Sequence, residues 1–106
     1  MKILVLGDVM GSSGRKALKK NLPNIIEQNQ INFSVINGEN AADDGKGITK
    51  EIAEEFFSLG IDVITSGNHI WDKRETTNFI EKENRLLRPA NLVNGSPGRG
   101  YKIYYS

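Results

Sequence analysis

Short apolar runs alternate with stretches of helical periodicity along this chain, a pattern typical of repeated β–α units. Residues 2–7, 32–37 and 61–66 are apolar runs that lead into a glycine, and each has the length of a buried strand. The first run is apolar without interruption, which predicts a strand buried on both faces. A short fourth strand is expected at residues 86–87, and the alternating residues 101–106 predict a terminal strand.

Three helices are expected between and after these strands. The first should begin near Ser12 or Ser13, either of which can cap it, and run to about residue 29, with Pro23 causing a kink or a division into two pieces. The second covers residues 49–59, where a threonine supplies the cap and apolar residues recur at helical spacing. The third covers residues 72–83, where an acidic pair three residues apart resembles a capping box.

Strands that alternate with amphipathic helices predict an α/β fold with a mostly parallel sheet and flanking helices. The chain of 106 residues, 38% hydrophobic and 25% charged, is long enough for one globular domain over residues 1–106. The strand-like pattern at its end directly follows a glycine-rich loop, where a domain normally continues. We therefore expect this domain to be the N-terminal part of a longer protein.

Charge and cysteine content narrow the function classes. The net charge is +1 and the two signs are interspersed, so nothing indicates a groove for a long nucleic acid or a membrane-binding patch. There is no cysteine, so a metal would have to be held by oxygen and imidazole. The first apolar run is too short for a signal peptide, and we expect a cytoplasmic protein.

Polar side chains follow all three predicted strands at the point where each strand ends: Asp8 after the first, Glu39 and Asn40 after the second, Asn68 and His69 after the third. Neighbouring parallel strands end at the same edge of a sheet, so these side chains should converge. Each has an ordinary alternative role: a cap for Asp8, a polar turn for Glu39 and Asn40, a structural histidine for His69. Together they resemble part of a metal site for phosphate ester hydrolysis.

The glycine-rich segment before the first helix suggests a different ligand. Its spacing is not that of a dinucleotide or P-loop motif, although Ser12, Ser13 and Arg15 at a helix start could contact a phosphate. A flexible loop that leads into the helix is the simpler interpretation.

The chain resembles the YmdB-like family of calcineurin-type metallophosphoesterases from residue 1 to about residue 101. The resemblance is carried by four motifs in order: GDVMGSSGR, NGENAADDGKGIT, GIDVITSGNHIWDK and RPAN. It implies the N-terminal half of a four-layer αββα sandwich. It also implies two divalent metal ions, iron or manganese, and phosphodiesterase activity on 2′,3′-cyclic nucleotides.

The resemblance also assigns roles to the strand-end residues. Asp8 and Asn40 resemble ligands of the first metal, Glu39 the bridging carboxylate, Asn68 a ligand of the second metal and His69 the proton donor to the leaving oxygen. The nucleophile is expected to be a metal-activated hydroxide. The family has further histidine ligands in its C-terminal half, which this chain lacks, so the isolated chain should bind metal weakly and be nearly inactive.

The expected partner is a small phosphodiester such as a cyclic nucleotide. The alternative is a non-catalytic module that binds a nucleotide or phosphate and regulates another activity. Association with further copies of the chain, through an exposed terminal strand, stays open.

Overall fold

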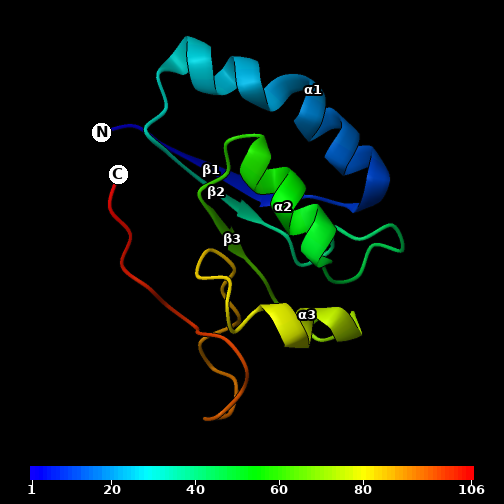
Figure 1. Cartoon of the computed structure of the whole chain (residues 1–106). Coiled ribbons are helices and arrows are strands. Elements are labelled where there is room, and N and C mark those ends of the chain that lie inside the picture. Colours follow the sequence, from blue (N-terminus) through cyan, green and yellow to red (C-terminus); the bar gives the residue numbers. More distant parts are fainter.

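The computed structural model describes all residues, 1–106, and shows a small parallel sheet with helices packed on it (Figure 1). In chain order the elements are β1 (Ile3–Asp8), α1 (Gly11–Asn29), β2 (Phe33–Asn37), α2 (Lys50–Ser58), β3 (Val63–Thr65) and α3 (Arg74–Phe79). The strands lie in the order β1-β2-β3, and both neighbouring pairs are parallel. The predicted α/β class with a parallel sheet is confirmed.

The helix α1 starts earlier than predicted and is not divided. It begins at Gly11 after Met10, and no side chain caps it, so the expected serine caps at Ser12 and Ser13 are wrong. Pro23 lies inside one continuous helix, which curves over the sheet in Figure 1. The neighbouring Leu22 is almost completely buried, and this packing holds the helix together at a residue that removes one backbone hydrogen bond.

The helix α2 forms as predicted. The Thr49 hydroxyl accepts a hydrogen bond from the Ile52 backbone nitrogen at 3.1 Å and so caps the first turn. Its apolar face is buried against the sheet, with Phe56 fully enclosed. The chain leaves the helix through Gly60, whose φ of 109° favours glycine.

The helix α3 is shorter than the predicted range 72–83. It begins at Arg74, the preceding Lys73 provides no side-chain cap, and the capping box expected at Asp72 and Glu75 does not form. The Asp72 carboxylate instead binds the ring of His69 at 2.9 Å.

The main hydrophobic cluster lies on one face of the sheet. Leu6, Ile36 and Ile64 stand side by side in the register of the three strands. Ile36 and Ile64 belong to the buried cluster that includes residues of α1 and α2, and the partly buried Leu6 packs against this cluster. On the opposite face Val5 is 72% exposed and Ile3 55% exposed. The prediction that the first strand is buried on both faces is therefore wrong for this chain, because both large helices cover the same face.

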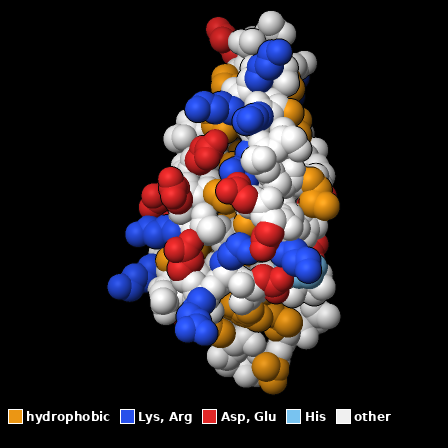
Figure 2. Space-filling view, turned by 90° about the vertical axis from the view of Figure 1, so that its right-hand side faces the viewer, with side chains coloured by type: hydrophobic (Ala, Val, Ile, Leu, Met, Phe, Trp, Pro, Cys, Tyr) orange, Lys and Arg blue, Asp and Glu red, His pale blue; other side chains and the backbone are white.

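Charged side chains of both signs are mixed on the face shown in Figure 2, in agreement with their even spread along the sequence. No helix of the structure is both long enough and apolar enough to span a membrane.

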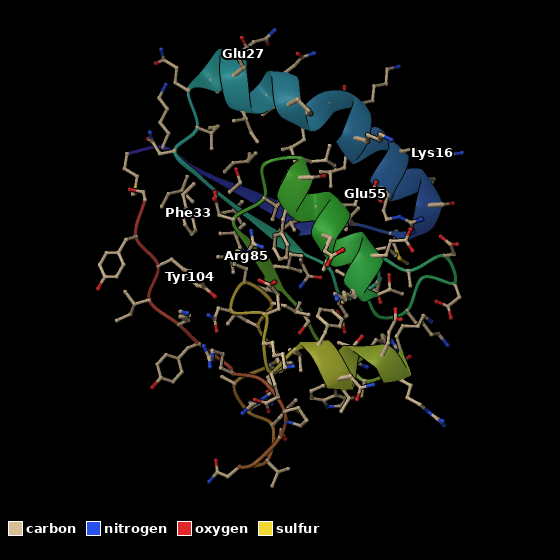
Figure 3. All side chains as sticks on the ribbon, in the orientation of Figure 1. Lys16, Glu27, Phe33, Glu55, Arg85 and Tyr104 are labelled. Atoms are coloured by element: carbon tan, nitrogen blue, oxygen red, sulfur yellow. The ribbon has the colours of Figure 1, made fainter.

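The last part of the chain contains no regular strand. The predicted strand at residues 86–87 is reduced to one isolated parallel bridge between Leu86 and Ile64. Residues 101–106 form no strand either. The Tyr104 ring in this last segment packs against the Phe33 ring, with 6.1 Å between the two ring centroids (Figure 3).

Candidate functional site

The register of the sheet brings the three strand ends to one edge. Asp8 stands opposite Asn37, and Asn37 stands opposite Thr65, so the polar residues that follow these strands leave the sheet side by side. The Asn37 side-chain amide donates a hydrogen bond to the Thr65 hydroxyl at 3.4 Å. In Figure 1 this edge is the right-hand end of the sheet, where the loop after β2 emerges.

Asp8 and Asn40 are in direct contact. The Asn40 Nδ2 donates a hydrogen bond to the Asp8 Oδ2 at 2.9 Å, across thirty-two positions of sequence. The Asn40 backbone is fixed as well, because its carbonyl accepts a bond from the Gly11 nitrogen at 2.9 Å. The second oxygen of Asp8 and the amide oxygen of Asn40 have no partner within the chain and can bind a cation.

Glu39 lies against Gly67 at the end of β3. A β-carbon added to Gly67 would be 2.6 Å from the Glu39 Oε2, and closer still to the Oε1 and Cδ atoms. Real β-carbons are essentially never nearer than 3.0 Å to another heavy atom, so any side chain at residue 67 would displace this carboxylate from its present position. The Glu39 side chain is half-buried and makes no hydrogen bond within the chain, and its carboxylate oxygens remain accessible to solvent.

The backbone around Glu39 is held by its neighbours. The Asn37 side chain accepts a hydrogen bond from the Glu39 nitrogen at 3.1 Å, and the Glu39 carbonyl accepts one from the Gly47 nitrogen at 2.6 Å. Gly38 is needed because a β-carbon there would be 2.8 Å from the Ile64 side chain. The φ of Gly38 is not positive, so close packing explains this glycine and an unusual backbone conformation does not.

Asn68 and His69 follow Gly67 on the next loop. Asn68 is exposed and its side chain is not hydrogen-bonded. The His69 Nδ1 lies 2.9 Å from the Asp72 Oδ2, and both side chains are about one-third exposed. No hydrogen bond links His69 to Asp8 or Glu39.

The loop of residues 41–47, between β2 and α2, is anchored by two ion pairs. Arg15 donates to the Ala41 carbonyl at 2.6 Å and to the Asp43 carboxylate at 2.7 Å. Lys73 binds the Asp44 carboxylate at 2.7 Å, and this hydrogen bond lowers the pKa of Asp44 below its ordinary value. The guanidinium of Arg15, for which the sequence suggested contact with a phosphate, is therefore bound to this loop.

The donor atoms at this edge suit a hard divalent cation, because they are carboxylate and amide oxygens. They do not complete a coordination shell: nowhere in the chain do three His, Cys, Asp or Glu side chains come together in a way that could hold a metal.

Sequence reasoning missed three residues of this edge: Gly67, Asp72 and Gly47. A β-carbon at Gly47 would be 3.0 Å from the His69 carbonyl, so this glycine, with φ 78°, lets the two loops touch. Asp72 could have been recognised from its position three residues after the only histidine. The other two contacts join loops distant in sequence, and no local pattern reveals them.

Comparison with known proteins adds the family context. The model of the YmdB-like protein family matches residues 4–106. A 2′,3′-cyclic-nucleotide 2′-phosphodiesterase of Bacillus subtilis (strain 168) is 47% identical over 100 residues, which cover 94% of this chain and 38% of that protein.

Two solved structures share the fold. A hypothetical protein from Thermus thermophilus superimposes with a TM-score of 0.88 at 35% identity, over 99% of this chain and 40% of its own. A phosphatase from Mycoplasma pneumoniae superimposes with a TM-score of 0.87 at 30% identity, over 98% of this chain and 39% of its own. The chain therefore spans about two-fifths of the length of these relatives.

Proposed function

This chain belongs to the YmdB-like protein family, and from that premise we propose that it is the N-terminal part of a metal-dependent phosphodiesterase. The proposed substrates of the complete protein are 2′,3′-cyclic nucleotides. The relatives support this choice, since the Bacillus protein is named for that reaction and the Mycoplasma pneumoniae structure is described as a phosphatase.

One observation carries the proposal: acidic and amide side chains from separate strands reach the same edge of the sheet with oxygens that no protein group satisfies. Asp8 and Asn40 touch at 2.9 Å, and the Glu39 carboxylate occupies space that only the absence of a side chain at Gly67 leaves open. These oxygens are open to solvent and carry no internal hydrogen bond, so they are free to bind a cation.

In this proposal Asp8 and Asn40 would hold one divalent ion, Asn68 would hold a second, and Glu39 would be a ligand of both. Iron or manganese fits the oxygen-rich donors. Such ions would supply Lewis-acid chemistry, activating a water and offsetting negative charge on the phosphate. The remaining ligands would lie outside this chain, so the 106-residue chain alone should bind metal weakly and have little activity.

His69 completes the proposed machinery as the proton donor. When the bond between phosphorus and a ribose oxygen breaks, its electron pair moves to that oxygen, and His69 supplies a proton there. General acid catalysis of this kind contributes roughly 10²- to 10⁴-fold to a rate.

Two variants of the complete protein separate the roles. Glu39→Ala should lose bound manganese and turnover of a 2′,3′-cyclic nucleotide together, whereas His69→Ala should keep the metal and lose turnover by roughly 10²- to 10⁴-fold. Glu54→Ala, on the exposed side of α2, is the control and should match the wild type. Wild-type rates in both site variants would refute the proposal.

A further inference from the structure

The single histidine of the chain is held by a carboxylate of its own loop. The His69 Nδ1 and the Asp72 Oδ2 are 2.9 Å apart, a normal hydrogen-bond length. A carboxylate only accepts, so Nδ1 must carry the hydrogen in this contact. The other ring nitrogen, Nε2, has no partner in the chain.

The turn that carries the two residues is fixed by backbone contacts that do not involve the Asp72 carboxylate. The Ile70 nitrogen bonds to the Gly67 carbonyl at 3.1 Å, and the Asp72 nitrogen bonds to the His69 carbonyl at 3.0 Å. The next residue, Lys73, is tied to Asp44. The Asp72 side chain makes no other hydrogen bond and does not cap α3, so its only hydrogen-bond partner in the chain is the His69 imidazole.

We propose that Asp72 is a positioning residue for His69. It fixes the imidazole so that the hydrogen stays on Nδ1 and Nε2 is the atom that delivers a proton to the leaving ribose oxygen. During that step the P–O bond breaks, its electron pair goes to oxygen, the Nε2 proton follows, and the ring is left neutral with its Nδ1–H still bound to Asp72. The kinetic half of this inference rests on the proposed phosphodiesterase function.

The orientation of the ring can be measured without substrate or metal. Because the chain contains one histidine, its imidazole nitrogens give unambiguous ¹⁵N signals at a pH where the ring is neutral. The wild type should show the hydrogen on Nδ1. The isosteric variant Asp72→Asn can donate from its amide and should shift the hydrogen to Nε2, as an amide in place of the carboxylate does in a serine protease triad. Glu75→Gln, an exposed acid in the first turn of α3, is the matched control and should match the wild type.

Kinetics of the complete protein test the consequence. Asp72→Asn should reduce kcat on a 2′,3′-cyclic nucleotide by about 10²-fold with little change in KM. On an aryl phosphodiester, whose phenolate leaves without a proton, the same variant should stay within about threefold of the wild type. A role that is only structural would lower both rates equally.

The inference is overturned if the wild type and Asp72→Asn show the same tautomer, or if both substrates slow down to the same extent. A wild type that hydrolyses no phosphodiester would overturn the proposed function instead. The tautomer measurement would still decide whether Asp72 orients the ring.

Discussion

Substituting Gly67 by alanine adds one methyl group and should displace the Glu39 carboxylate. The backbone of Gly67 is not in the left-handed region, so alanine is acceptable to the main chain. The added β-carbon, however, would be 2.6 Å from the Glu39 Oε2, whereas ordinary contact begins at 3.4 Å. The carboxylate must therefore move by roughly 1 Å, and a displacement of that size in a catalytic site can cost about 10²-fold in rate.

The assay compares manganese affinity and cyclic nucleotide turnover in the complete protein with and without this substitution. Both should fall, turnover by about 10²-fold, while thermal stability stays close to that of the wild type, because Glu39 can rotate away into solvent. Gly7→Ala is the matched control: Gly7 lies at the end of β1, and an added β-carbon there meets nothing within 4 Å. If Gly67→Ala binds metal and turns over substrate as well as Gly7→Ala does, the present position of the Glu39 carboxylate is not required for activity and the prediction is refuted.

Two further predictions concern stability. Phe56→Ala should lower the free energy of unfolding by about 3–5 kcal/mol in urea titrations, because this ring is fully buried between α2 and the sheet. Ile103→Ala, at a residue 72% exposed, should change the free energy of unfolding by less than about 0.5 kcal/mol. Equal effects of the two substitutions would contradict the burial of Phe56 in the core. The Lys73 hydrogen bond lowers the pKa of Asp44 from its ordinary value of 3.8, so the stability from this pair is present above 3.8 and is lost as the pH falls through the lower pKa of the folded state. The difference in unfolding free energy between the wild type and Asp44→Asn should therefore be constant near neutral pH and shrink in strong acid, whereas a difference independent of pH would show that the pair does not form.

Local patterns were enough to predict the first three strands, the Thr49 cap and the edge of the sheet at which Asp8 and Asn40 meet. Strand ends in a parallel sheet are placed by topology, which hydrophobic periodicity reveals. The contact between Glu39 and Gly67 could not be predicted, since it depends on how two separate loops pack.

Two errors have a clear physical origin. Asp72 has the spacing of a helix cap, but an imidazole three residues earlier competes for its carboxylate and binds it. Val5 has the apolar character of a core residue, yet the helices in this chain pack on the other face of the sheet and leave it exposed. A sequence pattern indicates which residues are apolar enough to be buried, but the packing of the neighbouring helices decides which of them are.

The most direct test of the proposed metal site is anomalous diffraction from crystals of the complete protein grown with manganese. We predict manganese peaks at the carboxyl ends of the strands, next to the carboxylates of Asp8 and Glu39 and the amide oxygens of Asn40 and Asn68. Manganese bound elsewhere, with Asp8 and Glu39 facing away from it, would contradict the account.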